Sequence, residues 1–162
     1  MAAPAQISPV PTYATSVPSA TELFAQRVRQ SGQRVALRWK GRGAWQSATF
    51  DDWNRASREI AGGLLALGVK VGDRVGILAN TRAEWLYCDV AIVMTGAVTV
   101  PIYQSNLPHE CEYILSDSGA TIAIVENPVQ LEKLVAERDK LAGVKKVILL
   151  DPTARLDKPD AK

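Results

Sequence analysis

The chain has 162 residues, of which 47% are hydrophobic and 22% are charged, close to the average for soluble globular proteins. Its 19 basic and 17 acidic residues give a net charge of +2, and because the two signs are interspersed, the sequence offers no basic stripe for a nucleic acid. The composition does not require a disulfide scaffold. Cys88 and Cys111 lie in apolar helical patterns that predict buried free thiols, and a reducing cytoplasm is the expected location.

The two ends of the chain differ from its middle. Residues 1–18 contain four prolines and no Lys or Arg, which predicts a disordered leader and excludes a secretory signal. Residues 151–162 are polar and predict a surface linker, so the folded domain is expected between residues 19 and 150. The longest apolar run, residues 90–103, is interrupted by polar residues, a glycine and a proline, and it is shorter than the roughly 20 residues that a membrane-spanning helix needs.

The first predicted elements are a helix and a β-hairpin. The helix covers residues 21–32, with Ser19 or Thr21 as its N-terminal cap. Residues 35–40 and 45–50 then alternate between apolar and polar positions on either side of a turn with two glycines, which is the pattern of a β-hairpin.

The clearest predicted helix covers residues 50–67. Thr49 is its expected N-cap, with Asp52 in the position of the capping-box partner. Gly62 and Gly63 lie inside the helix, where each costs about 1 kcal/mol relative to Ala. Two interpretations stay open: another backbone packs closely against these glycines, or they only loosen the last turns.

A short apolar strand over residues 75–79 precedes a second well-defined helix. Thr81 and Glu84 are in capping-box register at its start, and the helix runs to Met94. Because it is apolar on most faces, it is predicted to be largely buried. Asp89 inside this helix needs solvent, a cap or a basic partner, and such a structural role is favoured over a catalytic one.

The alternation of strands and helices continues to the end of the domain. Strands are predicted over residues 97–102, 121–125 and 145–150, and helices over residues 108–119 and 128–141. Such an order is typical of a parallel sheet with right-handed crossovers. The predicted fold class is α/β: a Rossmann-like, mostly parallel sheet flanked by helices, with an N-terminal β-hairpin.

The residues themselves reveal no catalytic constellation. Ligands of open α/β sheets bind beyond the carboxyl ends of the strands, and no loop there contains a glycine-rich phosphate-binding motif. The single histidine, His109, is expected at the surface, without partners at the spacing of a metal site or a catalytic triad. Acidic pairs at residues 51–52 and at Glu110 and Glu112 are explained by helix dipoles. No catalytic residue and no metal ligand is therefore predicted.

Three segments in a fixed order resemble the N-terminal part of adenylate-forming acyl-CoA synthetases. They are GLLALGVKVGDRVGILANTRAEW at residues 63–85, GAVTVPIY at residues 96–103 and YILSDSGATIAIVE at residues 113–126. The long-chain fatty acid CoA ligases are the most similar subclass. The resemblance implies that a fatty acid carboxylate attacks ATP to give an acyl-adenylate and pyrophosphate, and that coenzyme A then displaces AMP. It implies ATP, Mg²⁺ and coenzyme A as cofactors, with Mg²⁺ stabilising the phosphate charge.

The family's phosphate loop, adenine motif and catalytic lysine do not occur in these 162 residues. The resemblance thus implies a partial N-terminal subdomain of a longer ligase, inactive alone and binding no cofactor tightly. Its expected partners are the remainder of the ligase and, in that parent, a fatty acid, with peripheral membrane contact consistent with such a substrate. An uncovered apolar face predicts weak self-association. The alternatives are a non-catalytic binding or interaction module and an unrelated Rossmann-like enzyme.

One loop is a candidate for contact with a cofactor. In relatives with coenzyme A bound, the loop after the GAV strand lies beside the pantetheine arm, and the resemblance maps this loop onto Tyr103, Gln104 and Ser105. These residues also follow the carboxyl end of a predicted strand. The alternative is a solvated loop in which Ser105 or Asn106 caps the next helix.

Overall fold

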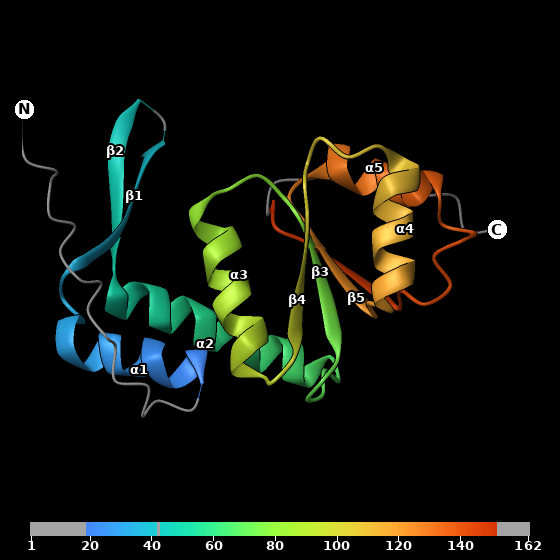
Figure 1. Cartoon of the computed structure of the whole chain (residues 1–162). Coiled ribbons are helices and arrows are strands. Elements are labelled where there is room, and N and C mark those ends of the chain that lie inside the picture. Colours follow the sequence, from blue (N-terminus) through green and yellow to red (C-terminus); the bar gives the residue numbers. More distant parts are fainter. Residues whose placement is uncertain (1–18, 42, 152–162) are drawn as a thin grey trace, which may run out of the picture.

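The computed structural model describes residues 19–41 and 43–151, so the predicted leader and all but the first residue of the predicted tail lie outside the described residues. In chain order the elements are α1 (Ala20–Ser31), β1 (Val35–Gly41), β2 (Ala44–Thr49), α2 (Phe50–Ala66), β3 (Arg74–Leu78), α3 (Ala83–Met94), β4 (Val98–Ile102), α4 (Pro108–Ser118), β5 (Ile122–Val125), α5 (Pro128–Ala136) and β6 (Lys146–Leu149). Figure 1 shows the sheet with α4 and α5 at one end of the molecule and α1 with the β1–β2 hairpin at the other, while α2 extends from the hairpin to the sheet.

The centre of the fold is a four-stranded parallel sheet in the order β4-β3-β5-β6, which confirms the predicted α/β class (Figure 1). Ile77 of β3 is level with Pro101 of β4 on one side and with Ile124 of β5 on the other. The two central strands, β3 and β5, are apolar at nearly every position because helices cover both faces of the sheet.

Alternate residues of the central strands serve two separate hydrophobic clusters. Val75, Ile77 and Ile124 pack with α2 and α3 on one face. Leu78 and Val125 point to the opposite face, where they pack with α4 and α5. This two-sided burial follows from the period of two in a β-strand.

Helices α2 and α3 are joined by polar contacts as well as by apolar packing. Trp53 donates its indole N–H to the Leu86 carbonyl oxygen at 3.2 Å, and the buried Ser57 donates its hydroxyl to the Tyr87 carbonyl oxygen at 3.0 Å. Trp53 and Ser57 are four residues apart and therefore lie on the same face of α2. Every residue of α3 is buried or half-buried, which confirms the prediction for this helix.

The N-terminal elements form as predicted. Ser19 caps α1 by accepting a hydrogen bond from the Glu22 amide at 3.2 Å. Thr49 and Asp52 make both hydrogen bonds of the capping box of α2. Helix α1 packs on α2 through an edge-to-face contact between Phe24 and Trp53, with ring centroids 5.1 Å apart. The hairpin pairs antiparallel, as its alternation predicts.

One expected helix cap is wrong, and so is one of the two interpretations left open for the glycines of α2. Thr81 and Glu84 form no capping box, because α3 begins at Ala83 and Glu84 instead accepts two hydrogen bonds from the Arg82 guanidinium. The pair with Arg82 gives the Glu84 carboxylate two hydrogen bonds from a cation, whereas the expected cap would have given it one from a main-chain amide. Gly62 has no backbone packed against it, and neither has Gly63, since a Cβ at either position would meet nothing within 4 Å.

Helix α5 is shorter than predicted. It ends at Ala136, and turns replace the helix expected up to residue 141. Leu141 is nevertheless buried against the α4–α5 face of the sheet. The apolar pattern that suggested a longer helix is therefore satisfied by a turn that returns this side chain to the core.

Candidate functional site

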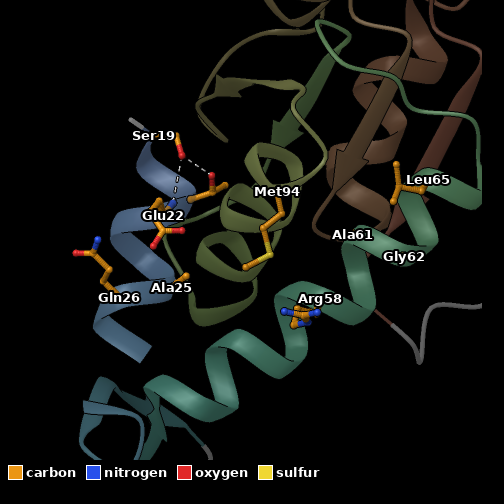
Figure 2. A pocket seen from close by; sticks show the side chains of 10 residues that line it. Ser19, Glu22, Ala25, Gln26, Arg58, Ala61, Gly62, Leu65 and Met94 are labelled. Carbon is orange, nitrogen blue, oxygen red and sulfur yellow. Dashed lines mark hydrogen bonds between the residues drawn. The ribbon is translucent and has the colours of Figure 1, made fainter. Parts of the chain in front are cut away.

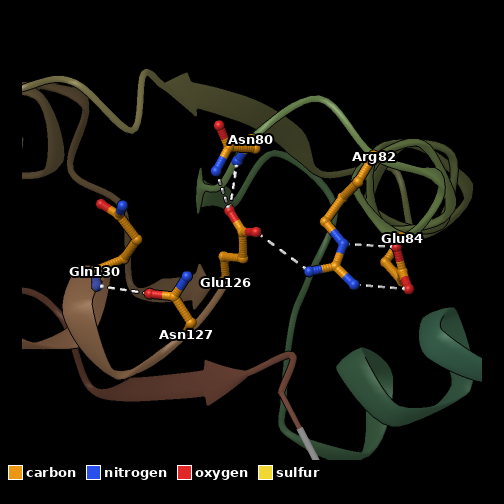
Figure 3. A network of polar contacts seen from close by, with 6 residues as sticks. All are labelled: Asn80, Arg82, Glu84, Glu126, Asn127 and Gln130. Carbon is orange, nitrogen blue, oxygen red and sulfur yellow. Dashed lines mark hydrogen bonds and ion pairs between the residues drawn. The ribbon is translucent and has the colours of Figure 1, made fainter. Parts of the chain in front are cut away.

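The carboxyl ends of β3 and β5 meet at the point where the strand order of the sheet reverses. From β3 the chain passes through α3 to β4 on one side, and from β4 it returns through α4 to β5 on the other side of β3. Ligands of open α/β sheets bind at such a point. Asn80 and Arg82 follow β3 there, and Glu126 follows β5 (Figure 3).

A network of hydrogen bonds centred on Glu126 bridges the two strand ends. One carboxylate oxygen accepts the Asn80 main-chain and side-chain N–H groups, both at 2.8 Å. The other oxygen accepts a hydrogen bond from Arg82 at 3.2 Å. Arg82 also binds the carboxylate of Glu84 at 2.7 and 3.0 Å, so one guanidinium joins two acids (Figure 3).

Electrostatics keep the acids of this network charged. The Glu126 side chain is only 12% exposed, and burial alone would raise its pKa. The hydrogen bonds from Asn80 and the charge of Arg82 outweigh that effect and hold the pKa of Glu126 below its usual value. The Arg82 hydrogen bonds likewise lower the pKa of Glu84. The crevice between β3 and β5 is therefore filled by an internally satisfied ion network.

Sequence reasoning missed this network, although it directed the search to the carboxyl ends of the strands. A search for glycine-rich motifs cannot detect it, because the network contains no glycine. Its central acid, Glu126, is also more than 40 residues from Asn80 and Arg82 in the sequence. The only signal is that an acid follows the apolar strand β5 at once, while Asn80 and Arg82 closely follow β3. In a parallel sheet these positions meet at the same edge.

The first turn of α5 adds a further polar group to this edge. Asn127 caps the helix, its side-chain oxygen accepting the Gln130 amide at 3.1 Å. Gln130 is buried, and its side-chain oxygen has no hydrogen-bond partner among the described residues. Figure 3 shows its amide group extending away from Glu126.

The predicted cofactor loop follows β4 on the same edge of the sheet. The Tyr103 side chain is 78% exposed, Ser105 is exposed and Gln104 is half-buried. Lys133 of α5 donates from its ammonium group to the Gln104 and Asn106 carbonyl oxygens, at 2.5 and 2.8 Å. Lys133 thus holds the loop backbone in place, while the side chains of Tyr103 and Ser105 are exposed to solvent.

The alternative role for this loop, capping by Ser105 or Asn106, is wrong. The residue at the N-cap position of α4 is Leu107, and no side chain at that position accepts a helix amide. The Glu110 carboxylate instead accepts the Leu107 amide at 2.8 Å. An acid in the first turn also suits the positive end of the helix dipole.

The other residues that the sequence analysis singled out lie apart from this network. Cys88 and Cys111 are free and buried, and burial raises the pKa of Cys88 to about 12. His109 is exposed on α4. Asp89 is half-buried and lines a small cavity together with Thr21 from the first turn of α1, where the helix dipole favours a carboxylate. Within residues 19–41 and 43–151, no group of three or more His, Cys, Asp or Glu side chains could hold a metal ion.

A separate groove of about 860 Å³ lies between α1, α2 and the end of α3 (Figure 2). Ala61, Leu65 and Met94 form part of its apolar lining. Its acid, Glu22, is paired with Arg29 at 2.6 Å. The acid of the groove is therefore already paired, and the carboxyl edge of the sheet, where Arg82 joins two acids, is the better candidate site.

Comparison with known proteins shows similarity over nearly the whole described chain. Residues 24–162 match the family described as AMP-binding enzyme. A long-chain-fatty-acid–CoA ligase from Xenopus laevis, ACSBG2, is 33% identical over 135 residues, which are 82% of this chain and 18% of that relative.

Solved structures agree with the sequence relatives. A Mycobacterium tuberculosis fatty acyl CoA synthetase superimposes with a TM-score of 0.72 at 27% identity, covering 88% of this chain and 30% of that one. The O-succinylbenzoate coenzyme A synthetase MenE from Bacillus subtilis, solved with ATP and magnesium, gives a TM-score of 0.66 at 27% identity over 79% of this chain and 32% of that one. The chain thus spans less than a third of these proteins and less than a fifth of the Xenopus relative. Among the described residues, no helix is both long and apolar enough to cross a membrane.

Proposed function

Because the chain belongs to the AMP-binding enzyme family, we propose that it is the N-terminal part of a long-chain fatty acid CoA ligase. The parent reaction joins a fatty acid to coenzyme A at the expense of ATP, through an acyl-adenylate, and releases AMP and pyrophosphate. The observation that carries this proposal is the family match over residues 24–162, together with relatives that are long-chain fatty acid CoA ligases.

The cofactors of the parent are ATP, Mg²⁺ and coenzyme A. Bound Mg²⁺ would stabilise the phosphate charge while the fatty acid carboxylate attacks. The chain itself would provide a scaffold, with the reacting groups contributed by the remainder of the ligase. In support, the acids at the carboxyl edge of the sheet, Glu84 and Glu126, are already engaged with Arg82. On this proposal, the 162-residue chain forms no acyl-adenylate alone and binds no cofactor tightly.

The loop of Tyr103, Gln104 and Ser105 would border the coenzyme A channel. Its position at the carboxyl end of β4 supports this role, as does the exposure of Tyr103. Lys133 adds preorganisation, because its ammonium holds two loop carbonyl oxygens in place. A ligand arriving at this loop would then meet a fixed backbone.

The test compares the 162-residue chain with a chain extended by the downstream coding sequence. Each is given a long-chain fatty acid, ATP and Mg²⁺, and acyl-adenylate is measured with and without coenzyme A. Only the extended chain should form adenylate. Adenylate formation by the 162-residue chain would disprove the assignment of the chemistry to downstream residues. An extended chain that folds but adenylates no fatty acid would favour the alternative, a non-catalytic interaction module.

Tyr103→Ala in the extended chain tests the loop separately. We expect the KM for coenzyme A to rise about tenfold, the cost of losing one well-packed contact, while adenylate formation is unchanged. Tyr113→Ala is the matched control, because Tyr113 is 65% exposed on α4 and lies outside the loop. An equal rise in both variants would contradict a role for the loop.

A further inference from the structure

The segment that contains the β1–β2 hairpin has basic residues but no acidic ones. Arg34, Arg38, Lys40 and Arg42 lie between residues 34 and 50, and none of the 17 acidic residues falls in that range. The rest of the chain therefore holds 15 basic and 17 acidic residues and is slightly negative. Of these four basic residues, the structure places Arg38 and Lys40 on β1 of the hairpin.

The pairing of the hairpin places cations and an aromatic ring on one face. Lys40 is opposite Trp45, and Arg38 is opposite Ser47. Paired residues share a face, and so do residues two apart on one strand, so these four side chains lie together. Arg38, Trp45 and Ser47, together with the intervening Gln46, line one shallow hollow of about 270 Å³.

This face of the hairpin is open to solvent. Trp45 is 73% exposed, and Arg38 and Lys40 are both exposed. None of the ion pairs between described residues involves either cation. Figure 1 shows the hairpin extending away from α2 and from the sheet, so a broad flat surface could approach it without meeting the rest of the molecule.

We propose that this face, formed by Arg38, Lys40, Trp45 and Ser47, docks on an anionic lipid bilayer. Basic side chains are attracted to anionic headgroups, and tryptophan favours the membrane interface because one side of its ring is apolar and its N–H is polar. The choice of a lipid surface over a nucleic acid rests on the proposed function, because a ligase for long-chain fatty acids takes a substrate that partitions into membranes. The hairpin would hold the enzyme at the surface where that substrate is concentrated.

Binding of the full 162-residue chain to vesicles tests this proposal without requiring any ligase activity. The chain is sedimented with vesicles of phosphatidylcholine alone and of phosphatidylcholine mixed with phosphatidylserine. The variant Arg38→Gln/Lys40→Gln should bind the anionic vesicles about 25-fold more weakly, since each basic residue near such a surface contributes about fivefold. Added salt should weaken wild-type binding.

Two further variants localise the contact. Arg58→Gln/Lys70→Gln removes the same charge from exposed positions outside the hairpin and should bind like the wild type. Brominated lipids should quench the fluorescence of the wild type, and Trp45→Phe should abolish most of this quenching while the other three tryptophans remain. Melting curves of all variants should coincide, because the substituted side chains are exposed or, for Lys70, lie in a surface loop.

The proposal is overturned if phosphatidylserine does not strengthen binding, or if the two double variants weaken it equally. It is also overturned if the chain binds duplex nucleic acid in preference to anionic vesicles. A ligase assay that fails with an extended chain would count against the proposed function, whereas the vesicle result would stand by itself.

Discussion

Glu126→Gln removes the charge at the centre of the carboxyl-edge network while preserving the shape of the side chain. The glutamine carbonyl oxygen can keep both hydrogen bonds from Asn80, but its NH₂ group then faces Arg82, which can only donate. The variant loses one charge-assisted hydrogen bond, and the two that remain become neutral. Since hydrogen bonds to charged groups contribute about 1.5–3 kcal/mol, we expect the free energy of unfolding to fall by about 2 kcal/mol at neutral pH.

Urea unfolding at several pH values gives a second check on the same substitution. The pKa of Glu126 is lowered in the folded chain from its ordinary value of 4.5, so its stabilisation is complete above about pH 4.5 and is lost as the pH falls through the folded-state pKa. The difference between wild type and variant should therefore shrink below pH 4.5. Other acids titrate in both proteins and cancel in this difference.

Glu84→Gln is the control for Glu126→Gln, because Glu84 binds the same guanidinium but its side chain is 45% exposed. Exposed ion pairs contribute about 1 kcal/mol or less. A loss for Glu126→Gln no larger than the loss for Glu84→Gln would refute the view that the buried carboxylate dominates the network. This view would also be refuted if the difference in unfolding free energy between the wild type and Glu126→Gln stayed constant down to acid pH.

Two further predictions concern the interior. Gly76→Val should lower the free energy of unfolding by about 1–3 kcal/mol, because a Cβ there would come within 2.6 Å of the Leu115 side chain. Gly62→Ala should instead raise the free energy of unfolding by about 0.5–1 kcal/mol, because its Cβ would meet open space in a helix. Thermal melts in which both variants shift the melting temperature in the same direction would contradict this packing. Cys88, whose pKa burial raises to about 12, should resist alkylation by iodoacetamide at pH 8 until urea unfolds the chain, and rapid labelling of the native chain would contradict its burial.

The fold was largely predictable because its signals are local. Runs such as Val75–Leu78 and Ile122–Val125 are apolar at almost every position, and only a strand covered on both faces requires that. The caps at Ser19 and Thr49 were also predictable, since their partners lie three residues away. Local patterns failed at Thr81, because Glu84, which the predicted cap required, is hydrogen-bonded to the neighbouring Arg82 instead.

The candidate site was less predictable because its contacts are distant in sequence. Asn80 and Glu126 are 46 residues apart, and Lys133 reaches a loop carbonyl oxygen 29 residues before it. No periodicity links such positions, and only the order of strands in the sheet brings them to one edge. The charge balance of the whole chain misled for a different reason, because it hides a stretch without acids, residues 34–50, in which Arg38 and Lys40 lie two apart on one face of β1.

The way the sheet edge is filled narrows where a ligand can bind. The point of strand reversal, where an open α/β sheet usually leaves a crevice, is occupied here by Glu126 and its partners, so a ligand there would have to displace hydrogen bonds from Asn80 and Arg82. A ligand at the neighbouring loop after β4 would displace no such hydrogen bonds. Lys133 already binds the Gln104 and Asn106 carbonyl oxygens there, and Tyr103 is exposed. Binding at this edge should therefore depend on Tyr103 and be indifferent to Glu126→Gln in any variant that remains folded.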